Sequence, residues 1–208
     1  QKYKFLEIII INDGSKEIKK IKNIFQNFKK YFSNIRLYNF KKNRGVSFAL
    51  NYGINKSNGN YISWLSHDDY FHPDFFYKQI NFLKNKKSSI SFTNFYVVNS
   101  NKKIIKKINY SNLLFKLKDQ ILIRDNLNFC TFLIKKNIFK EMGMFDLTKR
   151  HTQDYYMLIK ILQKYKPSYL NEYLFYSRKH KTQNSHKYKN ESYIEKEELY
   201  LSKIDEIK

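Results

Sequence analysis

Hydrophobic and polar residues follow each other along the first part of the chain in blocks that predict strands separated by helices. A short apolar run, FLEIIII at residues 5–11, ends in the turn cluster NDGS and predicts a strand buried on both faces. Apolar residues then recur at helical spacing over residues 16–32, which predicts an amphipathic helix. Further strands are expected at residues 35–40 and 59–65, with a helix at 46–57 between them. This order indicates a mostly parallel sheet flanked by helices.

The pattern is less regular after Pro73, but it still predicts discrete elements and shows no internal repeat or linker. Residues 111–125 are ambiguous. We expect helices at 74–85, 137–142, 153–165 and 190–207, a hairpin from 89–99 and 103–109, and strands at 129–135 and 168–178. The fold class that this predicts is α/β, in one domain.

Composition bounds the class of protein further. With 208 residues, 42% of them hydrophobic and 18% aromatic, the chain is too apolar to be disordered. Its longest aliphatic run, Ile8–Ile11, is much too short to cross a membrane, and no signal peptide is visible. A single cysteine, Cys130, excludes an internal disulfide and is compatible with a reducing compartment. We therefore expect a cytoplasmic location.

The formal net charge of +22 raises the question of nucleic-acid binding. The lysines are spread over the whole length, and no zinc-finger spacing, aromatic RNA-binding box or basic region with heptads is present. We expect no specific nucleic-acid partner. A basic surface suits equally well an anionic small substrate or the anionic face of a membrane, with which we expect peripheral contact.

Three acidic residues follow predicted strands, where ligands bind in parallel α/β sheets. Asp13 lies in NDGS after the first strand, and Asp68 with Asp69 lies in SHDD after the third. Asp13 could simply cap a helix, because Asp, Gly and Ser are ordinary turn and cap residues. Adjacent carboxylates repel each other, which a hard divalent cation would relieve, although a solvated turn is the simpler local interpretation of SHDD.

Three further residues could carry chemistry, and each also has a plain structural interpretation. Asp154 begins a predicted helix, where a carboxylate interacts favourably with the helix dipole. Arg44 precedes another predicted helix and could reach a phosphate, as could the free amides there. His180 follows a predicted strand, and a loop histidine is most often only exposed.

Taken in order, four motifs are more specific than any one of them: EIIIINDGS, NRGVSFALNYGINKSNGNYISWLSHDDYFHPDFF, GMFDLTKRHTQDYYMLIK and YSRKHKTQNS. This series resembles the family 2 glycosyltransferases with the GT-A fold, a Rossmann-like fold of enzymes that transfer sugars from nucleotide donors. The resemblance extends from residue 1 to residue 186. It implies one glycosyltransferase domain over residues 1–186, followed by a charged helix over residues 187–208.

The resemblance also implies roles for particular residues in donor binding. Asp13 matches the aspartate at a strand end that contacts the nucleobase, and Arg44 lies in the segment that faces the donor ribose and diphosphate. Asp68 matches the position of a metal ligand in the DXD region. Asp69 is a second candidate ligand, and His180 matches a late histidine near the metal and diphosphate. The implied cofactor is Mn²⁺ or Mg²⁺.

The implied catalytic residue is Asp154, as the general base that deprotonates an acceptor hydroxyl. The function that follows is inverting transfer of a sugar from a nucleoside diphosphate to a glycan or lipid-linked acceptor, in bacterial surface polysaccharide or lipooligosaccharide synthesis. Two alternatives stay open. A hydrolase could use Asp68 and Asp154 as an acid/base pair, and an inactive or truncated sugar-nucleotide binding module would keep the fold without turnover.

The chain departs from the family pattern at several positions. Ser66 stands where many members have the first aspartate of DXD, so metal binding would rest on Asp68. Gln153 replaces a common glutamate before the base, and Tyr156 replaces a frequent aspartate. We also expect that the family's opening strand and helix are missing from this chain, because its first residues match the segment that normally follows them.

Overall fold

Helices and strands follow one another in nearly the order that the sequence predicts. The computed structural model describes residues 1–111, 127–180 and 188–205. The predicted ambiguous segment lies outside these residues, apart from residue 111. The elements of the first half are β1 (Ile8–Asp13), α1 (Ile18–Lys29), β2 (Ile35–Phe40), α2 (Val46–Lys56), β3 (Tyr61–Ile62), β4 (Tyr70–Phe71), α3 (Phe75–Lys86), β5 (Ile90–Val98) and β6 (Ile104–Ile108).

The second half adds a helical turn, two strands and three helices around the same core. The strand expected at 129–135 forms only in its last residues, because its first three form a 3₁₀ turn. The strand expected at 59–65 is likewise only two residues long. The elements are η2 (Phe129–Thr131), β7 (Leu133–Lys135), α5 (Lys136–Glu141), α6 (Gln153–Lys164), β8 (Ser168–Arg178) and α8 (Lys189–Asp205).

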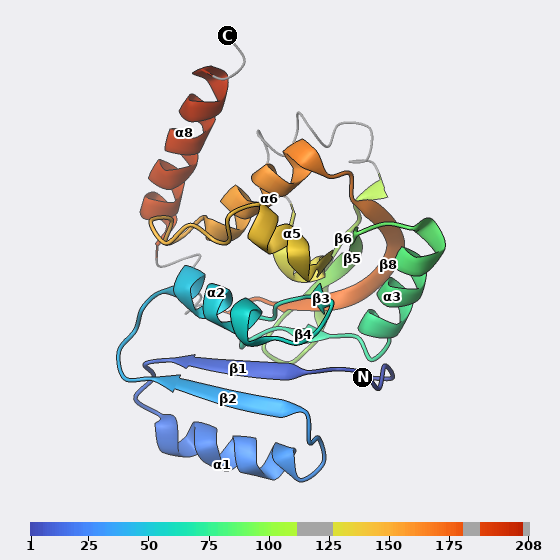
Figure 1. The fold of residues 1–208 in the computed structure, drawn as a ribbon, viewed down its shortest axis with the longest axis vertical. Coiled ribbons are helices and arrows are strands. Elements are labelled where there is room, and N and C mark those ends of the chain that lie inside the picture. Colours follow the sequence, from blue (N-terminus) through green and yellow to red (C-terminus); the bar gives the residue numbers. More distant parts are fainter. Residues whose placement is uncertain (112–126, 181–187, 206–208) are drawn as a thin grey trace.

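A small parallel sheet is formed by β1 and β2, in register from Ile8 with Ile35 to Asp13 with Phe40. Figure 1 shows α2 above this pair and α1 below it, each on the side of the strand that it contacts. The prediction that the first strand is buried on both faces is wrong. Ile8 is 42% exposed and only Asn12 in β1 is fully buried, because the sheet has just two strands among the described residues.

The larger sheet has the strand order β3-β7-β5-β8-β4, with β6 paired to β5. Only β5 and β8 are parallel in it; the other pairs are antiparallel. The α/β class is confirmed, but a mostly parallel sheet is not observed. The predicted hairpin explains part of this difference, because the short turn between β5 and β6 permits only antiparallel pairing.

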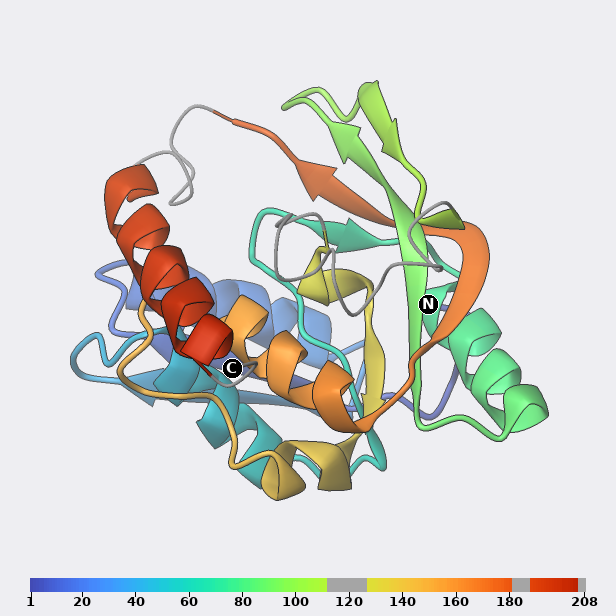
Figure 2. The same ribbon diagram turned by 90° about the horizontal axis from the view of Figure 1, so that it is seen from above.

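A register shift between β5 and β8 bends the larger sheet. Thr93 pairs with Leu170 but Asn94 pairs with Tyr173, so β8 bulges outward, and Figure 2 shows its strong curvature. The buried Asn94 side chain stabilises the bulge, since its Oδ1 accepts hydrogen bonds from the Tyr110 amide (2.8 Å) and the Tyr169 hydroxyl (2.8 Å). The bend directs the end of β8 towards β4, with which it pairs.

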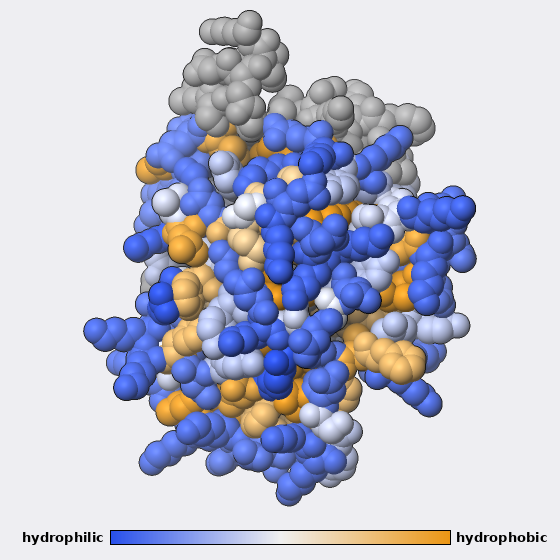
Figure 3. Space-filling model, in the orientation of Figure 1, coloured by the Kyte–Doolittle hydropathy of each residue, from blue (hydrophilic) through white to orange (hydrophobic). Residues whose placement is uncertain are grey.

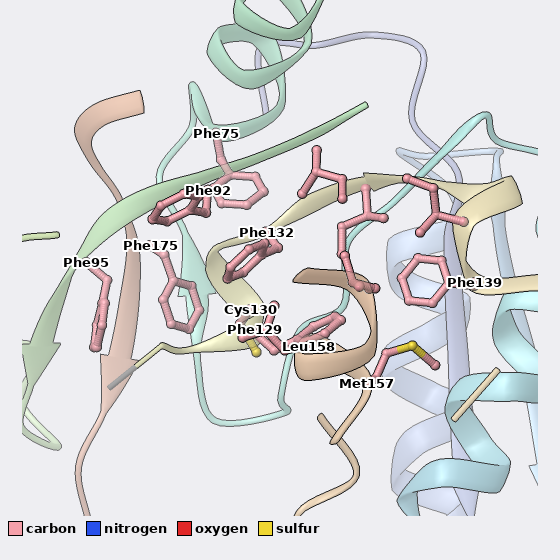
Figure 4. Close-up of a cluster of buried hydrophobic side chains, with 14 of the residues drawn as sticks. Phe75, Phe92, Phe95, Phe129, Cys130, Phe132, Phe139, Met157, Leu158 and Phe175 are labelled. Carbon is pink, nitrogen blue, oxygen red and sulfur yellow. The ribbon is translucent and has the colours of Figure 1, made fainter. Parts of the chain in front are cut away.

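Aromatic side chains fill the core between the larger sheet and the helices. Figure 4 shows the phenylalanines of α3, β5, β8 and the η2–β7 segment packed together, and Phe75, Phe92 and Phe175 are fully buried. The Phe92 and Phe132 rings stack at a centroid distance of 5.1 Å. This core fixes η2, β7 and α6 relative to the sheet, and these elements carry or support the candidate site.

The charged terminal helix α8 packs against the rest of the chain. Leu199 is 3% exposed and forms a small apolar cluster with Tyr155 and Ile159 of α6. The division into residues 1–186 and 187–208 stays a prediction. No helix among the described residues is both long and apolar enough to cross a membrane.

Candidate active site

The carboxylate of Asp13, at the end of β1, binds the start of α2. Its Oδ1 accepts a hydrogen bond from the Arg44 amide (2.8 Å) and its Oδ2 one from the Gly45 amide (2.9 Å). The adjacent Gly14 has φ +79°, and a Cβ there would lie 2.5 Å from the Asn43 backbone nitrogen, so only glycine fits this close approach. Asp13 thus does not cap the helix that follows it; it binds the amides of the α2 N-cap residue Gly45 and of Arg44 before it.

Arg44 lies beside this turn with its guanidinium over the Phe48 ring, 3.4 Å from the ring centroid. Phe48 lies in the first turn of α2, and Arg44 directly precedes the N-cap residue Gly45, so the guanidinium reaches over this turn. The contact holds a positive charge at the end of β1, where the free amides at the start of α2 also favour an anion. The role of Arg44 towards a diphosphate stays a prediction.

Asp68 and His180 meet although 112 residues separate them. His180 Nε2 lies 2.7 Å from Asp68 Oδ2, and both side chains are partly exposed, at 25% and 18%. Burial raises the pKa of Asp68, but the hydrogen bond with His180 and the neighbouring His67 outweigh it, so the pKa lies below its usual value. Asp68 is therefore ionised at neutral pH and remains reachable from solvent.

Asp69 has a different environment from its neighbour. Its Oδ1 accepts a hydrogen bond from the Arg178 amide at the end of β8 (2.8 Å), which ties the SHDD turn to that strand. Burial, together with the charge of Asp68, raises the pKa of Asp69 to about 6, although the bond from Arg178 acts in the opposite direction. Asp69 is thus the less suitable of the two carboxylates for binding a cation.

The residues present can be compared with the needs of Mn²⁺ or Mg²⁺. Among the described residues, no group of three or more His, Cys, Asp or Glu side chains is arranged to hold a metal ion. Asp68 and His180 offer an ionised carboxylate and an imidazole at one point, which suits a cation that takes its remaining ligands from a bound diphosphate. The pair fits such a cation only together with a phosphate-bearing ligand.

Asp154 lies in the first turn of α6. Its Oδ1 accepts a hydrogen bond from the Tyr155 amide (2.9 Å). Burial raises the pKa of the Cys130 thiol far above its usual range, and the charges of Asp69 and Asp154 act in the same direction. Both carboxylates are therefore within electrostatic reach of Cys130. The thiol itself stays protonated and is no candidate nucleophile or metal ligand.

The loop before α6 is held in place by residues for which no role was predicted from the sequence. Asn51 of α2 exchanges two hydrogen bonds with the Phe145 backbone (2.8 and 2.9 Å), and the Ser47 hydroxyl donates to the Lys149 carbonyl (3.1 Å). From the other side, Glu195 of α8 binds the backbone just before Asp154. The loop that leads to the predicted base is thus connected to α2, whose N-terminus lies beside Asp13 and Arg44.

Comparison with solved structures defines the class of fold. The chain superposes on the structure of Staphylococcus aureus TarS in complex with UDP-GlcNAc with a TM-score of 0.67, at 15% identity, over 85% of this chain and 50% of that one. It also superposes on GalNAc-T7 with UDP, GalNAc and Mn²⁺, with a TM-score of 0.63 at 12% identity, over 85% of this chain and 38% of that one. This is the GT-A fold of glycosyltransferases.

Sequence comparison then gives the family. The family model described as glycosyl transferase family 2 matches residues 1–143, and the chain belongs to this family. It is 37% identical over 193 residues to an uncharacterized glycosyltransferase of Rickettsia bellii, covering 90% of this chain and 27% of the relative. It is 27% identical over 95 residues to the putative teichuronic acid biosynthesis glycosyltransferase TuaG of Bacillus subtilis, covering 46% of this chain and 37% of TuaG. The chain thus spans about a quarter of the first of these relatives.

Proposed function

We propose that this chain carries the donor site and catalytic base of an inverting glycosyltransferase that uses a nucleoside diphosphate sugar and a divalent cation. The observation that carries the proposal is the meeting of Asp68 and His180, which lie 2.7 Å apart although 112 residues separate them; the charges of Asp69 and Asp154 also both act on the Cys130 thiol. In this proposal Asp68 and His180 hold the diphosphate with its cation, and the Asp154 carboxylate faces the acceptor hydroxyl. Two GT-A neighbours bind UDP or UDP-GlcNAc, which favours a uridine donor.

Donor binding would use the residues at the two strand ends. Asp13 keeps unused lone pairs on both oxygens, because each accepts only one amide, so it can still accept from a nucleobase N–H. Arg44 and the amides at the start of α2 would meet the diphosphate. Asp68 and His180 would hold Mn²⁺ or Mg²⁺, which when bound supplies electrostatic stabilisation of the departing diphosphate.

Catalysis would then depend on Asp154. Its carboxylate takes the proton from the acceptor hydroxyl while the hydroxyl oxygen forms a bond to the anomeric carbon. The bond from that carbon to the diphosphate oxygen breaks, and the nucleoside diphosphate leaves with the electron pair. Attack on the face opposite the leaving group inverts the anomeric centre. General-base assistance of this kind contributes about 10²- to 10⁴-fold to the rate.

The acceptor that we propose is a glycan or a lipid-linked saccharide used for bacterial surface polysaccharide or lipooligosaccharide. The similarity to TuaG, whose name assigns it to teichuronic acid biosynthesis, supports this choice. The lipid-linked acceptor would be reached at the cytoplasmic face of the inner membrane. A positively charged protein surface favours approach to such an anionic membrane, and the chain carries a formal charge of +22.

Helix α1 is the surface best suited to membrane contact. Two apolar side chains of α1 are exposed, Ile24 at 49% and Phe28 at 61%. Tyr31, just after the helix, is 88% exposed. In Figure 3 hydrophobic residues lie among hydrophilic ones over the lower part of the molecule, where β1, β2 and α1 lie. One acidic residue, Glu17, accompanies a basic set made up of Lys16, Lys19, Lys20, Lys22, Lys29 and Lys30. This is the composition of an interfacial helix.

The membrane proposal predicts salt-sensitive binding to anionic vesicles. We expect cosedimentation with phosphatidylglycerol-containing vesicles at 0.1 M salt, and its loss towards 1 M, as the Debye length shortens from about 10 to about 3 Å. The double variant Ile24→Ser, Phe28→Ser should bind several-fold more weakly. Leu147→Ser, which removes an equally exposed apolar residue elsewhere, is the matched control. Equal binding to vesicles of pure phosphatidylcholine would argue against the proposal.

The function itself is tested by nucleoside diphosphate release. The chain is incubated with Mn²⁺, a panel of UDP-, GDP- and dTDP-sugars, and a short-chain lipid-linked saccharide as acceptor. We expect release from at least one donor that requires the acceptor and stops when EDTA is added. Full release without acceptor would favour a hydrolase. Binding of a donor without release in any combination would favour an inactive binding module.

A further inference from the structure

Glu195, on the terminal helix α8, makes an unusual set of contacts with the loop that precedes Asp154. Its Oε1 accepts a hydrogen bond from the Arg150 amide (3.0 Å). Its Oε2 accepts three, from the His151 amide (3.0 Å), the Thr152 amide (3.0 Å) and the Thr152 hydroxyl (2.8 Å). One carboxylate thus binds the backbone of three consecutive residues. Such charge-assisted hydrogen bonds are about twice as strong as neutral ones.

These contacts replace the side-chain capping bond that the N-terminus of α6 lacks. Thr152 is the N-cap residue, but its side chain makes no capping bond within the helix; the hydroxyl donates to Glu195 instead. The negative charge that favours a helix N-terminus is therefore supplied partly by α8. Asp154 follows the N-cap by two residues, so the backbone that Glu195 binds leads directly into the turn that carries the proposed base.

Three further contacts hold α8 in this position. Lys149 forms an ion pair with Glu198 (3.0 Å), the His151 ring stacks on Tyr188 with centroids 4.8 Å apart, and Leu199 packs on α6. Figure 2 shows the loop before α6 passing against α8. The loop is thus bound along several consecutive residues, and its position depends on α8.

We propose that Glu195 is a positioning residue, which fixes the backbone of residues 150–152 and thereby sets where the Asp154 carboxylate lies. The proposal rests on the proposed function, in which Asp154 is the base. In this proposal α8 helps to position the catalytic base, although the charged sequence of α8 suggests only a solvated helix. Displacement of a catalytic group by about 1 Å can cost about 10²-fold in rate, so a loosened loop should lower turnover without weakening donor binding.

The test compares two substitutions on the same helix. Glu195→Gln keeps the shape but presents an NH₂ group to backbone amides that need an acceptor. Glu198→Gln removes the same charge three residues away, where the side chain is 59% exposed and pairs with the Lys149 ammonium. Glu195→Asp keeps the carboxylate and should restore part of the lost function. Each variant is measured for UDP affinity in Mn²⁺, for turnover, and for the ¹³C carboxyl resonance of Asp154, assigned with Asp154→Asn.

We expect Glu195→Gln to lower turnover by about 10- to 100-fold, to leave UDP affinity within twofold, and to shift the Asp154 resonance and its titration. Glu198→Gln breaks an exposed ion pair, which contributes little to stability, and should change each of these much less than Glu195→Gln. An unchanged Asp154 resonance in Glu195→Gln would overturn the proposal, as would a loss of UDP affinity equal to the loss of turnover. Absence of turnover in the unmodified chain would instead contradict the proposed function, and the resonance would still decide whether Glu195 positions Asp154.

Discussion

Replacing Asp154 by asparagine is expected to lower sugar-transfer turnover by at least about 100-fold, the low end for loss of a general base. Asparagine cannot take a proton from the acceptor hydroxyl. It can still accept the hydrogen bond that Asp154 Oδ1 receives from the Tyr155 amide. Folding and UDP affinity should therefore stay near those of the unmodified chain. Steady-state kinetics measures the loss of turnover, and calorimetry measures the UDP affinity.

A matched control for this substitution lies on the same loop. Asp146→Asn removes a carboxylate that accepts hydrogen bonds from the Thr148 amide (2.8 Å) and hydroxyl (2.7 Å) but has no proposed catalytic role. It should keep nearly full turnover. If Asp154→Asn also keeps full turnover, Asp154 serves only the N-terminal turn of α6, and the base must be sought elsewhere.

Replacing Asp68 by asparagine is expected to abolish the Mn²⁺ dependence of UDP binding. The substitution removes the ionised carboxylate beside His180, and a neutral amide is a much weaker ligand for a hard cation. Electron paramagnetic resonance of Mn²⁺ measures this directly, because the signal of free Mn²⁺ falls when UDP and the chain together bind the ion. The unmodified chain should reduce the signal in the presence of UDP, and Asp68→Asn should not.

The neighbouring carboxylate provides the comparison for Asp68. Asp69→Asn should reduce Mn²⁺ binding much less, because an asparagine oxygen can still accept the hydrogen bond from the Arg178 amide. Thermal unfolding of both variants shows whether the turn is intact. Equal loss of Mn²⁺ binding in the two variants would mean that both carboxylates bind the ion, while no loss in Asp68→Asn would refute the assignment.

Elements with a strong local pattern could be predicted from the sequence. The helix expected at 16–32 is α1, since its apolar residues recur at helical spacing, and the strand expected at 168–178 is β8 with the same bounds. The strand expected at 59–65 is reduced to the two residues of β3, and the two-residue strand β4 was not expected. Both are defined by antiparallel pairing, β3 with β7 and β4 with β8. Local periodicity does not predict pairing between segments that are distant in the sequence.

The candidate site could be predicted only where a motif marks it. Asp68 and His180 were both expected near a metal through the family resemblance, and the structure brings them to 2.7 Å. Asp13 was weighed as a cap of the next helix, but its partners lie at the start of α2, where a turn closed by Gly14 places them. Glu195 could not be found, because one glutamate in a charged helix is indistinguishable in sequence from its solvated neighbours.

The most direct measurement of the central claim is a calorimetric titration of the chain with UDP, made in Mn²⁺ and again in EDTA. The proposed site, in which Asp68 and His180 hold the cation, should bind UDP at least about tenfold more tightly with the cation, equivalent to about 1.4 kcal/mol. Affinity that is the same in Mn²⁺ and in EDTA, or no binding in either, would contradict the claim that this site holds a nucleoside diphosphate together with a divalent cation.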